Sequence, residues 1–430
     1  MTPEVKKRIE QIRQGIVPEG YKKGKIGIVP IKWNEVPFST LFTSTSEYTD
    51  DLKQYPLYSL TIEDGITAKT ERYERSHLVK KENSYKVVRP NDYAYNPMNI
   101  RFGAVARHKG DIPVAVSGYY DIFTTVHESD LVFMDSFLTY GPMITYYNKV
   151  STGSLVEKQR VHFSDFLEFS LALPPLEERK KIAEILSTQD KAIELQGRKI
   201  EELKRFKKGC LEKMFPRKGQ KVPETRFPGF TGDWEQRKVS TIASDTRGGG
   251  TPATSNETYW SGNIPWIQSS DLAEGKLFGV EPRKYISRDG LNNSATQLVP
   301  ENSIAVVTRV GVGKLAFMPF SYTTSQDFLS LCKLQTEPHF TVYALYQMLQ
   351  GELQAVQGTS IKGMTKDDLL SKSIFAPKDE VEQQQLGSYF RNLDTLITLH
   401  QRKLEEMKKQ KKALMQLLLT GIVKTKGEVR

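Results

Sequence analysis

The chain has 430 residues, and at roughly 100–200 residues per domain this length predicts two to four domains. Hydrophobic residues make up 38% and charged residues 26%, as in an ordinary globular protein, and two cysteines are too few for a disulfide framework. The net charge of +10 favours a polyanionic partner, with nucleic acid the first choice and a membrane surface the second. No apolar run reaches the roughly 18 residues of a membrane span. The charged N-terminus lacks the apolar core of a signal peptide, so we expect a cytoplasmic protein.

The first globular domain is expected at residues 24–172, where short β-rich runs mix with a few helices. A turn at 88–92 leads into an apolar strand at 93–96, which runs into Arg101 ahead of a second strand at 104–106. An arginine directly after a strand can grip a phosphate or read a guanine edge. A structural salt bridge remains the alternative for this residue.

The first domain also contains a locally basic stretch. Between residues 69 and 89, seven Lys or Arg side chains stand against three Glu, with tyrosines interleaved. This mixture suits a loop that contacts phosphates and base edges, and the alternative is a solvated hairpin with charges of both signs. The candidate DNA contacts here are Lys69, Arg72, Tyr73 and Arg75, with Arg101 after the strand.

Residues 173–216 are predicted to form a long helix. Apolar residues recur there at alternating steps of four and three, which is the pattern of a heptad seam. Pro175 comes just before the helix, where proline is tolerated. Acidic residues follow at its start and lysines gather in its second half, as the helix dipole favours. Ser187 and Asp190 could form an internal capping box that breaks the helix.

The second globular domain is expected at residues 217–375. It repeats the order of the first, because a turn leads into a strand at 303–308, then Arg309 and a strand at 314–317. The segment 341–356 is typical of an amphipathic helix.

The segment Arg247-Gly-Gly-Gly-Thr-Pro252 is expected to be a flexible loop whose backbone N–H groups can approach a phosphate, although glycine runs are often plain linkers. For Tyr259, Trp260 and Trp266, packing in the core or a turn is favoured over base stacking, and Tyr259 is kept as a candidate. The candidate DNA contacts of the second domain are Arg247, Gly249, Thr251, Tyr259, Arg309, Lys314 and Lys362.

Residues 376–430 repeat the first long helix at an offset of 204 residues. The matched positions are Asp190 with Asp394, Lys207 with Lys411, and the block 195–204 with 399–408. Two similar helices in one chain can pair antiparallel. The predicted seam residues are Ile193, Ile200, Leu203, Ile397, Leu404 and Met407.

This repeat sets the expected fold class. We predict an α+β fold with two pseudo-repeated globular domains separated by two long helices that form an antiparallel coiled coil. The expected parts are an N-terminal helical segment at 1–23, the first domain at 24–172, a central spacer helix region at 173–216, the second domain at 217–375 and a C-terminal spacer helix region at 376–430.

The positive charge lies mainly on the spacer and the chain ends. Residues 196–221 carry +7 and residues 401–430 carry +6, whereas 24–172 and 222–375 carry −2 and −1. If the globular domains bind DNA, their phosphate contacts must therefore come from local clusters of basic residues.

No motif of a nucleic-acid enzyme is found. Gly313-Lys314 lacks the other residues of a phosphate-binding P-loop. Asn96-Pro97-Met98 only partly matches the motif of an adenine methyltransferase, and no glycine-rich cofactor loop precedes it. The histidines and cysteines show no zinc spacing. We expect neither a catalytic residue nor a metal site in this chain.

Taken together, these residues resemble the specificity subunits of type I restriction–modification systems, over nearly the whole chain. The strongest matches are the two helical blocks, 173–214 and 382–419. The segment 249–252 with Tyr259-Trp-Ser-Gly-Asn-Ile-Pro-Trp-Ile267 resembles a common opening of the second domain, and Thr308-Arg309 with Gly313-Lys314 resembles a recurring family pattern.

The resemblance implies that each globular domain is a target recognition domain that reads one half of a bipartite, asymmetric DNA sequence, with the coiled coil fixing the spacing. It implies as partners double-stranded DNA, two modification (methyltransferase) subunits and restriction (endonuclease and translocase) subunits, and no membrane. S-adenosylmethionine, ATP and Mg²⁺ would act in those partner subunits, and the chain alone would be non-catalytic without a cofactor of its own. Two hypotheses remain beside it: a coiled-coil adaptor without sequence preference, and a nuclease or methyltransferase with an unrecognised site.

Overall fold

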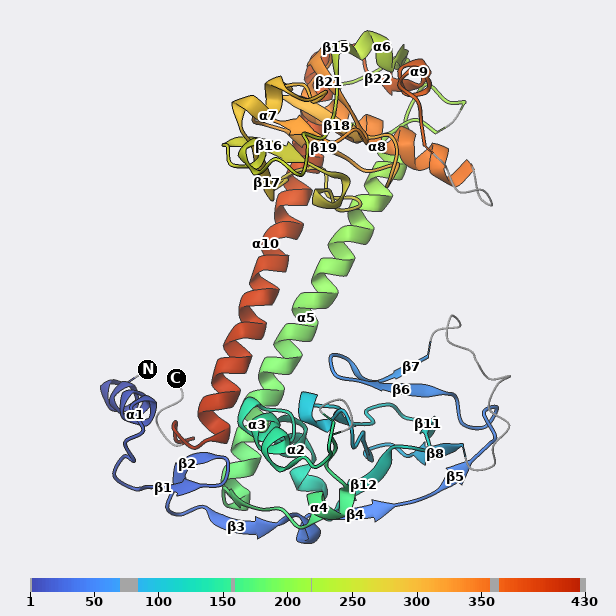
Figure 1. The fold of residues 1–430 in the computed structure, drawn as a ribbon. Helices are drawn as coiled ribbons and strands as arrows, with labels where there is room; N and C mark the ends of the chain where they lie inside the picture. The colour runs from blue at the N-terminus through green and yellow to red at the C-terminus, as the bar shows by residue number, and fades with distance from the viewer. Residues whose placement is uncertain (1, 70–83, 156–158, 218, 356–362, 426–430) are drawn as a thin grey trace. The chain divides into compact units, whose positions relative to one another are not determined.

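The computed structural model describes residues 2–69, 84–155, 159–217, 219–355 and 363–425. The chain divides into two compact units, one made of residues 1–196 and 403–430 and the other of residues 197–402. Each unit has its own hydrophobic core. Two helices contribute one half to each unit, and they are the long green and red helices of Figure 1.

The first unit is built on a four-stranded antiparallel sheet in the order β10-β9-β12-β4. A three-stranded sheet, β11-β8-β5, and three strand pairs, β1–β2, β3–β13 and β6–β7, accompany it. The bounds are α1 Pro3–Arg13, β1 Tyr21–Gly24, β2 Gly27–Pro30, β3 Asn34–Pro37, β4 Phe42–Thr45, β5 Tyr48–Thr49, β6 Tyr58–Thr61, β7 Gly65–Ala68, β8 Tyr85–Val88, β9 Tyr93–Tyr95, β10 Val105–Arg107, β11 Val114–Ser117, β12 Asp121–Thr125, α2 Leu131–Phe137, α3 Gly141–Val150, α4 Phe163–Leu167 and β13 Ser170–Leu173.

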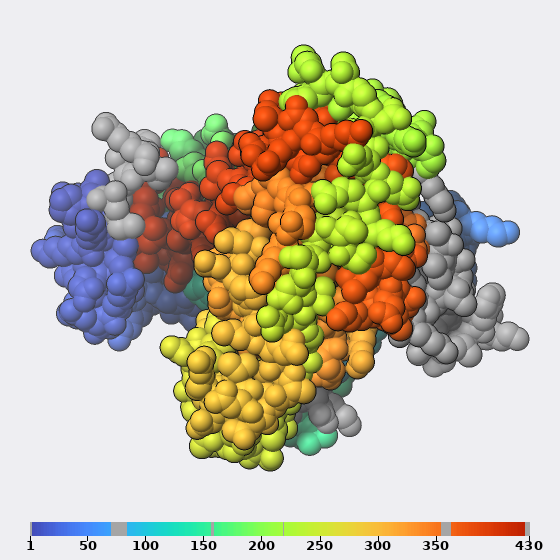
Figure 2. All heavy atoms as spheres, turned by 90° about the horizontal axis from the view of Figure 1, so that it is seen from above, coloured from blue at the N-terminus to red at the C-terminus, as the bar shows by residue number. Residues whose placement is uncertain are grey.

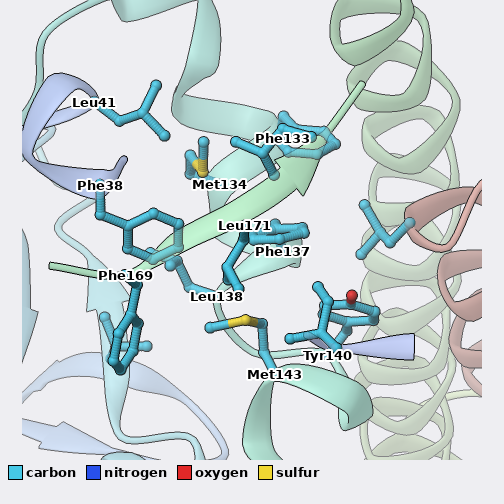
Figure 3. Packing of buried hydrophobic residues seen from close by; sticks show 14 of the residues in the cluster. Phe38, Leu41, Phe133, Met134, Phe137, Leu138, Tyr140, Met143, Phe169 and Leu171 are labelled. Atoms are coloured by element: carbon cyan, nitrogen blue, oxygen red, sulfur yellow. The ribbon is translucent and has the colours of Figure 1, made fainter. Parts of the chain in front are cut away.

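Aromatic rings fill much of the core of this unit. Tyr93 stacks on Phe123 with ring centroids 5.1 Å apart, and Phe38 meets Phe166 edge to face, also at 5.1 Å. Figure 3 shows part of the core, where the rings of Phe137 and its neighbours lie beside strand β13. Each such ring pair adds about 0.5–1.5 kcal/mol beyond the burial of apolar area. The sheet and the helices are therefore held as one body.

The second unit is built on the four-stranded antiparallel sheet β15-β21-β18-β19. A three-stranded sheet, β17-β16-β20, and the pair β14–β22 accompany it. On the face seen in Figure 2, segments before residue 300 (lime to yellow) lie against segments after it (orange to red), so this unit is not split into sequential halves. The bounds are β14 Glu235–Lys238, α6 Val239–Ile242, β15 Ala243–Gly248, β16 Ile264–Ile267, β17 Lys284–Ile286, α7 Arg288–Asn292, β18 Ser303–Val307, β19 Leu315–Met318, β20 Thr323–Thr324, β21 Phe328–Leu334, α8 Pro338–Ala355, α9 Lys366–Ser371 and β22 Ser373–Ala376.

The two large sheets have the same topology. When β9, β10, β12 and β4 are matched with β18, β19, β21 and β15, the strand orders coincide. The closing pair β3–β13 likewise matches β14–β22. The small sheets differ, because β16 and β20 pair in parallel whereas β11, β8 and β5 are all antiparallel. The duplication inferred from the helices thus extends into the globular domains, and the α+β prediction is confirmed.

The two long helices are continuous. Helix α5 runs from Leu176 to Met214 over 39 residues, and α10 runs from Glu380 to Leu419 over 40 residues. The predicted break at Ser187 is wrong, because its hydroxyl donates to the carbonyl oxygen of Glu184 within the helix instead of capping a new one. No described helix is both long enough and apolar enough to cross a membrane.

Within each unit, the first half of one helix lies against the second half of the other. In the second unit, Lys207 Nζ of α5 donates to Asp394 Oδ1 of α10 at 2.6 Å. In the first unit, Lys411 of α10 forms the reverse ion pair with Asp190 of α5. Because Lys207 matches Lys411 and Asp190 matches Asp394 in the repeat, this is the same bond formed once in each direction. The pairing of α5 and α10 is therefore antiparallel, as predicted.

The side chains of the predicted seam are buried to different degrees. Three are buried and three are half-buried. The buried ones are Ile200, Leu203 and Ile397, and the half-buried ones are Ile193, Leu404 and Met407.

The two ion pairs should differ in their effect on stability. The side chains of Lys207 and Asp394 are 10% and 22% exposed, and Asp394 also accepts a hydrogen bond from the hydroxyl of Tyr343. Replacing Asp394 with alanine leaves a nearly buried ammonium group without its partner and should lower the free energy of unfolding by about 3–5 kcal/mol. Asp190 is 50% exposed, so Asp190→Ala should cost about 1 kcal/mol or less. Chemical denaturation of both variants measures the difference, and equal losses would contradict this ranking.

Candidate nucleic-acid interface

The loop between β9 and β10, residues 96–104, holds the first predicted arginine. Arg101 is only 8% exposed, and its Nη1 donates to Gln159 Oε1 at 2.9 Å. Its carbonyl oxygen accepts a hydrogen bond from Asn148 Nδ2 at 2.7 Å, and its guanidinium carbon lies 4.7 Å from the ring centre of Phe102. In this conformation the side chain of Arg101 supports its loop. The prediction that it contacts DNA stays untested.

The next two residues of this loop differ from Arg101 in exposure or backbone conformation. The side chain of Phe102 is 50% exposed to solvent. Gly103 has a φ of 98°, in the left-handed region that glycine adopts without steric strain. It ends the short helical turn Ile100–Phe102.

The equivalent loop between β18 and β19, residues 308–314, presents its arginine differently. Arg309 is exposed and makes no hydrogen bond or ion pair with the described residues. Val310 beside it is 71% exposed. Lys314 is half-buried and its Nζ donates to the carbonyl oxygen of Ser269 at 3.3 Å, so this Gly-Lys pair belongs to a turn into β19. The two matched arginines therefore differ in exposure, since Arg309 is exposed and Arg101 is buried.

The glycine segment after Arg247 is not the flexible loop that we expected. A Cβ atom on Gly249 would lie 1.8 Å from the carbonyl oxygen of Ser325, and one on Gly250 would lie 2.5 Å from the backbone nitrogen of Thr296. Glycine is required here because the end of β15 packs tightly against neighbouring backbone. The run of glycines thus has a structural cause, which is close packing and not flexibility.

The polar side chains of this segment are held by local partners. Arg247 bonds Asp245 Oδ2 through Nε at 3.2 Å and Nη2 at 3.0 Å. The hydroxyl of Thr251 donates to Gln326 Oε1 at 2.7 Å. Both side chains are exposed and could exchange these bonds for a ligand, so their predicted DNA contacts stay predictions.

An aromatic cluster lies close to this segment. Trp260 and Trp266 meet edge to face at 5.0 Å, and Trp266 Nε1 donates to the carbonyl oxygen of Gly250 at 2.9 Å. The ammonium group of Lys284 lies over both rings, 5.5 and 5.7 Å from their centres. Packing, not base stacking, explains the tryptophans, as expected. Tyr259 is half-buried beside them, and Lys284 was missed because a single lysine in a mixed-charge segment gives no signal.

Part of the basic stretch of the first domain lies outside the described residues. Lys69 is described and exposed, directly after β7. The structure gives no account of the remaining candidates, Arg72, Tyr73, Arg75 and, in the second domain, Lys362.

A cleft of about 650 Å³ lies in the first unit between the β6–β7 turn, the segment after β10 and helix α2, with Lys411 at one side. Arg107 is bound there to Asp135 through Nε at 3.0 Å and Nη2 at 2.8 Å. Burial disfavours the charged guanidinium group, but the hydrogen bonds to Asp135 outweigh it and raise the pKa of Arg107. The basic groups of the cleft are thus largely neutralised, which does not favour a phosphate site.

Among the described residues, no group of three or more His, Cys, Asp or Glu side chains is arranged to hold a metal ion. Burial raises the pKa of the Cys332 thiol to about 11. This thiol is therefore not poised as a nucleophile. The candidate site therefore consists of equivalent surface loops, residues 96–104 and 308–314, on two sheets of the same topology.

Comparison with known proteins identifies this scaffold. The model of the type I restriction modification DNA specificity domain matches residues 136–205 and 231–409. The chain belongs to this family. The matched parts include most of α5 and α10 and most of the second domain, and in the first domain they begin only at α2.

Relatives of known name support the assignment to the DNA specificity domain family. The chain is 24% identical to a putative type I restriction enzyme MjaX specificity subunit of Methanocaldococcus jannaschii, over 98% of this chain and 93% of that one. It is 30% identical to the EcoR124I/EcoR124II specificity subunit of Escherichia coli, over 35% of this chain and 38% of that one.

Solved structures show a similar fold. A chain from a study of complex assembly and conformational transition of a type I R-M system has a TM-score of 0.57 at 17% identity, covering 92% of this chain and 99% of that one. The S subunit of M. genitalium has a TM-score of 0.54 at 11% identity, covering 93% and 99%.

The two loop arginines should respond differently to substitution. Arg101→Ala removes a buried guanidinium group and leaves Gln159 Oε1 without its donor, so it should lower the free energy of unfolding by about 1–3 kcal/mol. Arg309→Ala changes an exposed side chain without described partners and should stay within about 0.5 kcal/mol of the parent. Thermal and chemical unfolding of the two variants checks this, and a neutral Arg101→Ala would contradict the supporting role.

Proposed function

We propose that this chain is the DNA sequence-specificity subunit of a type I restriction–modification complex. Each globular domain reads one half of a bipartite DNA target, and α5 and α10 set the distance between the halves and dock the modification subunits. The observation that carries the proposal is the duplicated architecture, in which two domains of one sheet topology share two helices joined by reciprocal Lys–Asp bonds. Membership of the DNA specificity domain family supports it.

The physical logic favours an asymmetric target. A duplicated scaffold offers equivalent docking surfaces, and two copies of the same partner can bind surfaces related in this way. The loops on the two domains have different sequences, for example residues 96–104 and 308–314. Loops that differ present different groups to base edges, so the two half-sites should differ as well.

The chemistry is assigned to partner subunits. Two modification subunits would methylate adenine with S-adenosylmethionine, and restriction subunits would use ATP and Mg²⁺ to move along and cut DNA. The chain itself would contribute recognition and geometry without a reacting group. No membrane partner is proposed, and the site of action is the cytoplasm, where the host DNA lies.

Exchange of one domain tests sequence reading. Residues 222–375 are replaced with the corresponding domain of a relative, and DNA methylated by the complex with modification subunits is sequenced. One half of the target should change and the other half should stay. An unchanged target would instead indicate an adaptor without sequence preference, and methylation or cleavage by the purified chain alone would show a reacting group in it.

A matched insertion tests the role of the helices as a spacer. Seven residues are added between Gly197 and Arg198 in α5 and seven between Lys403 and Leu404 in α10, which leaves both Lys–Asp bonds in register. A heptad adds about 10 Å of helix, equal to about 3 base pairs of DNA. The spacing between half-sites should increase by up to that amount, with both half-sites unchanged, as sequencing of methylated DNA would show.

The control adds the heptad to α5 alone, which leaves the two helices unequal and should impair folding or assembly. A matched insertion that changed the half-sites themselves would contradict the spacer model.

A further inference from the structure

Each of the two matched loops exposes one apolar side chain. Phe102, in the loop between β9 and β10, is 50% exposed, and Val310, in the loop between β18 and β19, is 71% exposed. Single exposed apolar residues are normal on protein surfaces and need no explanation. Here the same loop of the repeat carries one in both domains, between an arginine and a glycine, although most other positions of the loops differ.

Backbone hydrogen bonds hold the first loop at Gly103 and the second loop at its start, Thr308. In the first domain, Gly103 N–H donates to the carbonyl oxygen of Ile100 at 2.8 Å, and Asn148 binds the backbone of the same turn at 2.7 Å. In the second domain, Met364 N–H donates to the carbonyl oxygen of Thr308 at 2.6 Å. A loop that is held at such points and keeps an apolar side chain in water is partly preorganised for an apolar partner.

The identity of the partner follows from what the repeat keeps and what it changes. The helices keep the same residues in both copies, such as the Lys and Asp of the reciprocal bonds. Two identical partner subunits require identical surfaces, so they fit the helices. The loops carry Phe in one copy and Val in the other, and such divergence fits surfaces that read different DNA sequences.

Double-stranded DNA has one prominent apolar feature in its major groove, the C5 methyl group of thymine. Base edges are otherwise polar there, so an exposed Phe or Val gains most by packing against that methyl group. The exposed guanidinium group of Arg309, beside Val310, makes no hydrogen bond or ion pair with the described residues, and it can bind a phosphate or a guanine edge at the same time. Because adenine is the proposed site of methylation, each half-site contains at least one thymine in its A·T pair.

We propose that Phe102 and Val310 each pack against the C5 methyl group of a thymine in the half-site read by their own domain. This inference rests on the proposed function, since it requires that each domain reads one half-site. It assigns the apolar part of base recognition to these two residues. It also moves the reading role in the first domain from Arg101 to its neighbour.

Uracil substitution tests the contact directly, because deoxyuridine pairs like thymidine but lacks the methyl group. The complex of this chain with modification subunits is bound to duplexes that carry the mapped target, with each thymine replaced in turn. Loss of one buried methyl group should weaken binding about fourfold at one position in each half-site.

The variants locate the contact. Phe102→Ala should bind uracil and thymine duplexes equally in the first half-site while it stays sensitive in the second, and Val310→Ala should show the reverse. Phe102→Leu, which keeps an apolar side chain, should retain part of the sensitivity and guards against a folding defect in the alanine variant. Ile31→Ala and Leu298→Ala replace exposed apolar residues elsewhere, 58% and 41% exposed, and should keep both sensitivities.

Three results would overturn the inference. The parent complex could be indifferent to uracil at every position, Phe102→Ala or Val310→Ala could keep full sensitivity, or either variant could fold normally but lose its modification subunits. The last result would make these residues contacts to the partner subunits. A parent complex without any bipartite target would instead refute the proposed function, so the two failures are distinguishable.

Discussion

Lys207 binds Asp394, and Lys411 binds Asp190, and the two ion pairs are equivalent positions of one repeat bonded in opposite directions. Taken together, the two pairs require α5 and α10 to run antiparallel, because the order of the partners along one helix is reversed along the other. The first half of each helix is thereby combined with the second half of the other in one unit. The rest of the architecture depends on this reciprocal arrangement.

Residues near the start of the chain bind the segment just after α10 in the first unit. The hydroxyl of Tyr21 donates to the carbonyl oxygen of Gly421 at 2.7 Å, and Arg8 bonds the carbonyl oxygen of Ile422. Residues near the start of the chain therefore complete the end of α10, much as Phe215 and Trp234 pack together after α5 in the second unit. Repeated parts build the frame, and the loops that differ between copies are left for recognition.

The sequence predicts those features of the fold and of the candidate site that depend on residues close together in the chain. The helices, their seam and the repeat follow from spacing along one segment, and strands such as β18 and β19 from short apolar runs. Strand order could not be predicted, because it depends on pairings between distant segments. The inward side chain of Arg101 is held by Gln159, and its backbone is held by Asn148; these two residues are 58 and 47 residues away in sequence. The same limit explains Gly249, where glycine indicated flexibility but the cause is a neighbouring strand.

The central claim is that one chain reads two DNA half-sites at a fixed separation. Mapping methylated adenines across the host genome, with and without an intact gene for this chain, tests it most directly. The account predicts one asymmetric bipartite motif with a constant unread spacer, which disappears when the chain is absent. A continuous motif, a variable spacer, or a motif that persists without the chain would contradict it.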